Sequence, residues 1–250
     1  MTLEAHERLF VALDTPDLDH ARKLVRTLAG RVGGYKVGLE LFTVGGPELV
    51  REIVASGESV FLDLKLHDIP NTVAGAAAAI TGLAVSHFTV HAGGGAAMIR
   101  RAVEASQSTA AERGLRPPTV LAVTVLTNHD DDELASIGLA GPCGDAVARL
   151  AALAREGGVG GLVCSPLEIA TARRILPHGE LVVPGIRPAA GPRPVRDDQS
   201  RVASPGEAVL RGADRLVIGR PITRADDPKE AAAAIAAEIE TAVQAGHDNP

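Results

Sequence analysis

Eight short runs rich in β-branched and other apolar residues recur along the 250-residue chain, and helix-compatible segments separate them. Strands that alternate with helices pair in parallel through right-handed crossovers. Eight such units in about 250 residues match the number and size of a (β/α)₈ TIM barrel. The sequence therefore predicts an α/β fold, with residues 1–250 forming a single barrel domain. The predicted strands are 8–14, 34–40, 59–65, 86–92, 119–127, 160–165, 180–186 and 214–220.

A doubly wound open sheet is the alternative fold. It is disfavoured because Asp14-Thr15-Pro16 follows the first predicted strand, where a glycine-rich dinucleotide fingerprint would stand. Helices are expected between the strands, for example over 17–29 and 228–245. No shift in composition marks a linker.

Composition narrows the class of protein. Hydrophobic residues make up 46% of the chain but aromatic residues only 2%, which suits buried parallel strands covered by helices. A net charge of −6 argues against a nucleic-acid partner. Cys143 and Cys164 match no metal or redox spacing, and no signal peptide or membrane-spanning apolar run is visible. We expect a cytoplasmic protein without a membrane partner.

The run FLDLKLHDIPNT, residues 61–72, concentrates charge at the end of the third predicted strand. Alternate residues of a strand share a face, so Asp63 and Lys65 are expected to point the same way. Pro70 prevents a regular strand from continuing and leaves Asp68 beyond its end. Such a trio is costly to bury and is typical of sites where charge takes part in chemistry. A surface ion pair before a helix is the alternative.

Polar residues also end the other predicted strands, and the active site of a barrel is built at the carboxyl ends of its strands. We expect them to converge on one mouth, and we interpret His67 and His91 as structural neighbours of the charges. The polar residues in or just after the other strands are Asp14, Lys36, His91, Thr127, Arg187 and Arg220.

The last two strands carry a phosphate-binding pattern. Pro184-Gly185-Ile186-Arg187 and Ile218-Gly219-Arg220-Pro221 each place a glycine shortly before an arginine. Glycine lets the backbone approach an anion, arginine binds oxygens bidentately, and barrels often hold phosphate at this position. The long polar stretch 187–205 is predicted to be a lid that brings Gln199 over the phosphate. Ordinary turn glycines with solvated arginines are the alternative.

Taken together, DLKLHDIPNT, VPGIR, IGRPIT and the aspartate after the first strand resemble the orotidine 5′-phosphate decarboxylase family, over residues 9–223. The resemblance implies a (β/α)₈ homodimer with active sites at the subunit interface. It also implies conversion of orotidine 5′-monophosphate (OMP) to UMP and carbon dioxide without a metal or organic cofactor.

The resemblance implies a role for each matching residue. Asp14 and Lys36 correspond to residues that contact the ribose, and Lys36 begins a chain of alternating charges. Asp63 would face the substrate carboxylate, and Lys65 would protonate carbon six of the pyrimidine. Thr127 would contact the pyrimidine.

The remaining matches concern the dimer and the phosphate. Asp68, Ile69 and Thr72 resemble residues donated across the dimer interface, where Asp68 would complete a Lys-Asp-Lys-Asp array. The residues that match the phosphate end of the site are Pro184, Arg187, Gln199, Gly219 and Arg220.

These residue types suit a decarboxylation that lacks an electron sink. A carbanion at carbon six must be stabilised by a cation already in place, and Lys65 can do this and then act as the acid. One charge pair at about 4 Å and an effective dielectric of about 20 contributes about 4 kcal/mol, against about 8–23 kcal/mol for a typical enzyme. Asp63 either orients Lys65 or disfavours the ground state, and both accounts stay open.

Three other functions remain possible at this point. A magnesium-dependent phosphosugar decarboxylase or aldolase of the same superfamily would add an acidic ligand after the second strand, where Glu40 lies. A Schiff-base aldolase would use Lys65 as a neutral nucleophile. A non-catalytic binder of phosphoribosyl ligands would not need the Asp63–Lys65–Asp68 array.

Overall fold

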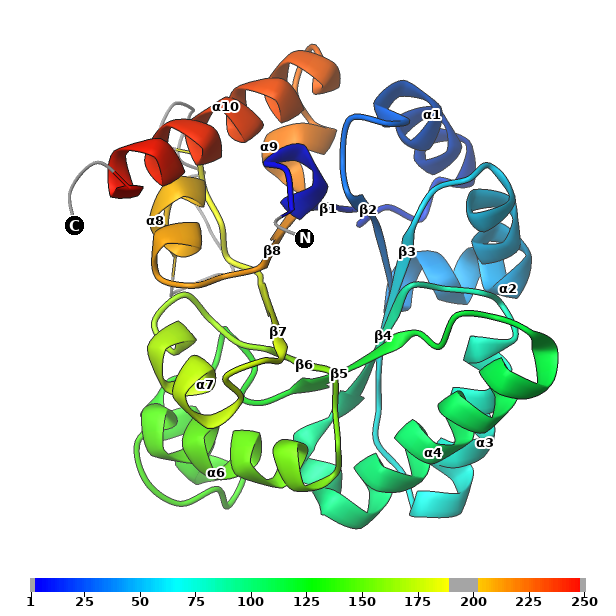
Figure 1. Cartoon of the computed structure of the whole chain (residues 1–250), viewed down its shortest axis with the longest axis vertical. Coiled ribbons are helices and arrows are strands. Elements are labelled where there is room, and N and C mark those ends of the chain that lie inside the picture. The colour runs from blue at the N-terminus through cyan, green and yellow to red at the C-terminus, as the bar shows by residue number, and fades with distance from the viewer. Residues whose placement is uncertain (1–2, 189–201, 248–250) are drawn as a thin grey trace.

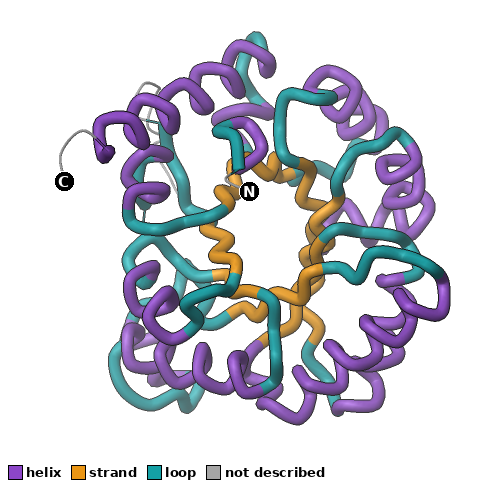
Figure 2. Tube along the Cα trace, in the orientation of Figure 1, coloured by secondary structure: helices purple, strands orange, loops and turns teal. Residues whose placement is uncertain are grey.

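The computed structural model of the chain describes residues 3–188 and 202–247, with side chains as far as residue 245. Eight parallel strands close into a barrel in chain order, and β1 pairs with β8 to complete the ring (Figure 1). Figure 2 shows the strands as an inner ring and the helices as an outer ring. The predicted (β/α)₈ barrel is confirmed. The strands are β1 (Leu9–Ala12), β2 (Gly34–Gly38), β3 (Val60–Leu66), β4 (His87–His91), β5 (Thr119–Val123), β6 (Gly161–Val163), β7 (Glu180–Val183) and β8 (Arg215–Ile218).

The helices of the outer ring connect successive strands, with α5 and α6 both between β5 and β6, and α9 and α10 after β8. Short 3₁₀ helices, η1 (His6–Arg8) and η2 (Ala92–Gly94), precede β1 and follow β4. The α-helices are α1 (Leu18–Leu28), α2 (Leu39–Ala55), α3 (Pro70–Thr81), α4 (Gly95–Arg113), α5 (Asp131–Ser136), α6 (Cys143–Glu156), α7 (Ile169–Ile175), α8 (Pro205–Leu210), α9 (Arg220–Thr223) and α10 (Pro228–His247).

Helix α1 shows how local sequence sets these elements. The Asp17 side chain accepts hydrogen bonds from the backbone N–H groups of Asp19 and His20 and so caps the helix. Its buried face repeats at helical spacing through Ala21, Leu24, Val25 and Leu28. The predicted helix 17–29 is confirmed, because it corresponds to α1 with its N-cap Asp17 and its C-cap Ala29. Helix α3 begins at Pro70, because the first helical position needs no N–H donor.

Several strands end earlier than their apolar runs. Strand β5 stops at Val123, which pairs with Val163, the last residue of β6. The Thr124 N–H still bonds to the Val163 carbonyl, but β6 does not continue further. Thr127 therefore lies in a loop four residues beyond the strand, and Asp14 lies two residues beyond β1. Both positions still belong to the carboxyl-terminal rim of the barrel.

Alternate strand residues divide the core into two parts. In β1 and just after it, Leu9, Val11 and Leu13 belong to the large cluster between strands and helices. Phe10 and Ala12 point the other way, into the barrel. The interior cluster contains Phe10, Ala12, Phe61, Leu121, Val182 and Val217.

A partly buried ionic network lies beside the interior cluster, between β4, β7 and β8. The Glu180 carboxylate contacts His87 Nε2 at 2.8 Å and Arg215 Nε at 2.7 Å, and Arg215 lies 5.1 Å from the Phe10 ring centroid. Arg215 also donates to the carbonyl of Glu7, next to β1. Burial of the Glu180 carboxyl raises its pKa, but the hydrogen bonds and charges of His87 and Arg215 outweigh burial and lower the pKa to about 2.

We therefore expect Glu180→Gln to destabilise the barrel by about 3 kcal/mol at pH 7. The folded pKa lies below the ordinary value of 4.5, so the stabilisation is present above pH 4.5 and is lost as pH falls towards 2. Urea unfolding at pH 7 and pH 3 measures the difference between wild type and variant, which should be smaller at pH 3. Glu104→Gln, which breaks an exposed pair with Arg101, is the control and should have almost no effect. A difference that stays constant with pH would contradict this account.

Candidate active site

A cavity of about 430 Å³ opens among the residues that follow the strands, within the usual size range of a small-molecule site. Its apolar side is formed by interior strand residues such as Phe61 and Val123. Its polar side is formed by charged residues from five of the eight strands or the loops that follow them. The polar and loop residues that line it are Asp14, Lys36, Asp63, Lys65, Thr127, Pro184, Gly185, Arg187, Gly219, Arg220 and Arg224.

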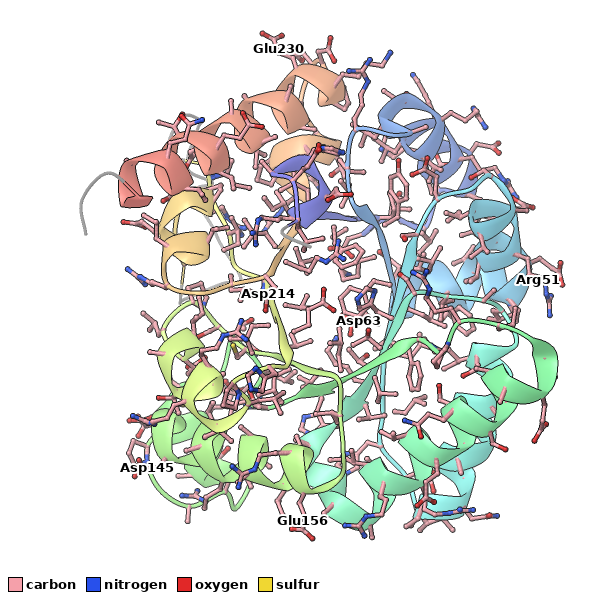
Figure 3. All side chains as sticks on the ribbon, viewed as in Figure 1. Arg51, Asp63, Asp145, Glu156, Asp214 and Glu230 are labelled. Atoms are coloured by element: carbon pink, nitrogen blue, oxygen red, sulfur yellow. The ribbon has the colours of Figure 1, made fainter. Side chains whose placement is uncertain are left out.

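The Asp63 carboxylate holds one side of this cavity together. Its Oδ2 accepts a hydrogen bond from Lys65 Nζ at 2.8 Å, and its Oδ1 accepts one from the Thr89 hydroxyl at 2.9 Å. The same Thr89 oxygen accepts the backbone N–H of Lys65, also at 2.9 Å. Thr89 is fully buried, and the side chain of Asp63 is only 13% exposed. Figure 3 shows Asp63 inside the ring of strands, whereas Arg51 and Glu156, on the helices of the outer ring, point outward.

The backbone at Lys65 departs from regular strand geometry. Its φ is 51°, a left-handed conformation that residues with a Cβ seldom adopt, and the pairing of β3 with β4 shifts between Leu62 and Leu66. Strand alternation predicts that Lys65 faces the cavity, and it does. It is placed there by a bulge and by the Thr89 hydroxyl rather than by a regular pleat.

A second lysine–aspartate pair lies on the neighbouring strands. Lys36 Nζ, from β2, donates to Asp14 Oδ1 at 2.8 Å. A Cβ at Gly38 would approach Lys36 Nζ to 3.0 Å, so glycine leaves room for the lysine to reach across. The cavity thus contains two ammonium groups, each bound to its own carboxylate.

Arginines occupy the part of the cavity formed by the loops after β7 and β8. Arg187 follows Gly185, whose φ of 76° requires glycine, and Arg220 begins the short helix α9 directly after Gly219. Ile186 and Ala203 form an isolated bridge that brings the two ends of the long loop together. Gln199, together with most of the predicted lid, lies outside the described residues.

His67 and His91 stack beside the Lys65 pair. Their rings are nearly parallel, with centroids 5.1 Å apart, and His91 Nδ1 accepts the backbone N–H of Gly93. Burial lowers the pKa of His91, and the positive charges of His67, Lys65 and His129 lower it further. A neutral, acceptor imidazole fits the structural role expected for His91.

The three residues predicted to act across a dimer interface do not line the cavity. Asp68, Ile69 and Thr72 are exposed at the start of α3, and Ile69 is 67% exposed. The Asp68 side chain accepts only the neighbouring Ile69 N–H among the contacts described.

The described residues contain no group of three or more His, Cys, Asp or Glu side chains arranged to hold a metal ion. Glu40, the candidate ligand of the magnesium-dependent alternative, is exposed near the start of α2 and is not part of the cavity wall. No helix in the described part of the chain has the length and hydrophobicity needed to cross a membrane.

The chain matches a family model described as "Orotidine 5'-phosphate decarboxylase / HUMPS family" over residues 7–235. The chain belongs to this family. The family description covers two groups of proteins, so more closely related sequences are needed to choose between them.

Similar curated proteins carry the decarboxylase name. The chain is 49% identical to the orotidine 5′-phosphate decarboxylase of Paramagnetospirillum magneticum, covering 92% of this chain and 97% of the relative. It is 51% identical to that of Anaeromyxobacter dehalogenans, covering 95% and 100%. A crystal structure of the Lactobacillus acidophilus decarboxylase superposes with a TM-score of 0.81 at 37% identity, covering 92% and 98%. These relatives favour the decarboxylase branch over the phosphosugar enzymes.

Sequence reasoning missed two residues of the site: Thr89, which is buried behind the cavity wall and holds Asp63 and Lys65, and Arg224, which lines the cavity. Thr89 has a sequence signal, because His87, Thr89 and His91 alternate in β4 and so place three polar side chains inside the barrel. Arg224 has a weaker one, its spacing of four residues from Arg220.

We expect Thr89→Val to lower decarboxylation by about 10- to 100-fold, because the Lys65 N–H and Asp63 each lose a partner and the lysine is no longer held in place. Stability should fall by about 1–3 kcal/mol, the cost of unpaired buried groups. Steady-state kinetics and urea unfolding measure the two effects. Thr89→Ser keeps the hydroxyl and is the control, and an equal loss of activity in both variants would show that the hydroxyl is not what matters.

Proposed function

We propose that this protein is an orotidine 5′-phosphate decarboxylase, converting OMP to UMP and carbon dioxide. The proposal rests on one observation above all. A buried carboxylate and an ammonium group form a salt bridge on one side of a cavity whose other side holds arginines, in a chain about half identical to proteins with that name.

The reaction breaks the bond between carbon six of the pyrimidine and its carboxylate. The electron pair stays on carbon six, carbon dioxide leaves, and a proton from Lys65 Nζ completes the product. The Lys65 ammonium, held at 2.8 Å from Asp63, lies ready to stabilise the developing negative charge before it donates. A cation fixed in advance needs no reorganisation during the reaction. Asp63 faces the substrate carboxylate and orients Lys65.

The other cavity residues bind and align the substrate. Asp14 and Lys36 contact the ribose, and Thr127 contacts the pyrimidine. The phosphate lies among the loops after β7 and β8, where Arg187 and Arg220 line the cavity. Binding energy gained at the phosphate, far from the reacting carbon, supports the interactions made only in the transition state. Pro184 and Gly219 line the same end of the cavity. Gln199, which lies outside the described residues, is proposed to bind the phosphate as well.

The direct test is the loss of OMP absorbance with the purified protein. Wild type should turn over OMP equally well with and without EDTA, whereas the magnesium-dependent alternative requires activity to disappear with EDTA. Lys65→Ala should lose at least about a thousandfold in kcat, since it removes both the cation and the acid. It should still bind UMP, as measured by calorimetry. Absent turnover by wild type would reject the proposal.

We further propose that the protein works as a homodimer that shares its active sites, each chain being a single barrel domain. Asp68, Ile69 and Thr72 are exposed and do not line the cavity of their own chain. Leu39 (59% exposed) and Ile69 are apolar and follow the neighbouring strands β2 and β3. Exposed apolar side chains at adjacent strand ends are typical of an interface. Asp68 would then meet the Lys65 of the second copy. Cys143 and Cys164 are not joined in a disulfide, which agrees with a cytoplasmic location.

Mixing two inactive variants tests this division of labour. Lys65→Ala and Asp68→Ala homodimers should each be inactive, but a hybrid has one site with both residues intact. Random exchange makes half of the dimers hybrid, so the mixture should recover about a quarter of wild-type activity. Size-exclusion chromatography with light scattering confirms the dimer. No recovery after verified exchange would show that Asp68 serves its own subunit.

A further inference from the structure

The third arginine of the cavity, Arg224, has no role in the proposed decarboxylation. It follows the last residue of α9, and its backbone N–H donates to the carbonyl of Arg220 at 3.1 Å. Residues four apart on a helical turn project from the same face. Both side chains do line the 430 Å³ cavity, so Arg224 stands next to Arg220 at the end formed by the loop after β8.

The guanidinium of Arg224 is exposed and available. Among the described residues it makes no hydrogen bond and no ion pair, in contrast to Arg173 and Arg215, which are bound to Asp214 and Glu180. It also borders a smaller hollow of about 110 Å³ that it shares with Asp14 and His20. The long Arg224 side chain therefore borders open space on two sides.

The balance of charges around the cavity favours binding of an anion. Two lysines and three arginines line it against two aspartates, a formal excess of three positive charges. Each lysine is already bound to an aspartate, whereas the Arg224 side chain has no acidic partner among the described residues. A phosphate monoester carries about −1.5 to −2 at pH 7, which exceeds what one arginine neutralises. Arginine also binds such oxygens through two parallel hydrogen bonds.

We propose that Arg224 is an outer phosphate-binding residue that selects substrates with a 5′-phosphate. It closes onto the phosphate beside Arg220 from the solvent side. This inference rests on the proposed function, because it names a further residue for the same substrate. An outer cation binds ground state and transition state alike, so it affects KM more than kcat.

The experiment compares UMP with uridine by calorimetry, because the two differ only in the phosphate. Arg224→Gln should weaken UMP binding by about 3- to 10-fold, the range for a charged hydrogen bond near solvent, and leave uridine binding unchanged. Arg224→Lys should retain part of the affinity, since it keeps the charge but not the bidentate geometry. With OMP, Arg224→Gln should raise KM by a similar factor at constant kcat.

Arg211→Gln is the matched control, because Arg211 is exposed and is not part of the cavity wall. It should leave UMP binding unchanged. Raising the salt concentration should reduce the difference between wild type and Arg224→Gln, since the contact is exposed to solvent. Unchanged UMP affinity in Arg224→Gln overturns the inference. An equal loss of uridine affinity also overturns it, because Arg224 would then bind the ribose, as proposed for Asp14. If wild type binds UMP no better than uridine, the proposed function fails as well.

Discussion

The site depends on the Asp63 carboxylate. One of its oxygens binds the Lys65 ammonium, and the other binds the Thr89 hydroxyl that in turn accepts the Lys65 backbone N–H. The lysine is therefore held at both its backbone and its side-chain end by one small buried group of atoms. This arrangement maintains the left-handed backbone at Lys65, which would otherwise be unfavourable. A cation fixed in this way can stabilise charge in a reaction that has no other electron sink.

The rest of the barrel packs around the Asp63, Lys65 and Thr89 side chains. The apolar interior, represented by Phe10, Phe61 and Leu121, fills the space between the polar mouth and the Glu180 network. It excludes water beneath Asp63, which strengthens the ionic contacts there. The salt bridges on β1, β2 and β3 then form one wall of the cavity, and the arginines after β7 and β8 form another. In the proposed function, the substrate phosphate is bound at the arginine wall while the reacting carbon lies beside Lys65 at the other wall.

Much of this architecture could be predicted from periodicity and residue type. Alternation of strand and helix patterns is a local property, and eight repeats leave few closed arrangements, so the barrel follows from the sequence. The same logic placed Asp63, Lys36 and Arg220 at one rim, because the carboxyl ends of parallel strands meet. Strand lengths were predicted less well, because a ladder ends where its neighbour ends, as at Val123 and Val163.

What the sequence by itself determined was the fold, the family and the set of charged residues at the mouth. Only the tertiary structure decided how they are held: that Lys65 sits on a bulge, that a threonine from β4 fixes it, and that Arg224 reaches the cavity beside Arg220. It also showed that Asp68, Ile69 and Thr72 are exposed rather than part of their own chain's cavity. The physical reason is that residue type and spacing follow local backbone geometry. Hydrogen bonds between strands, bulges and cavity walls depend instead on segments brought together only when the barrel closes.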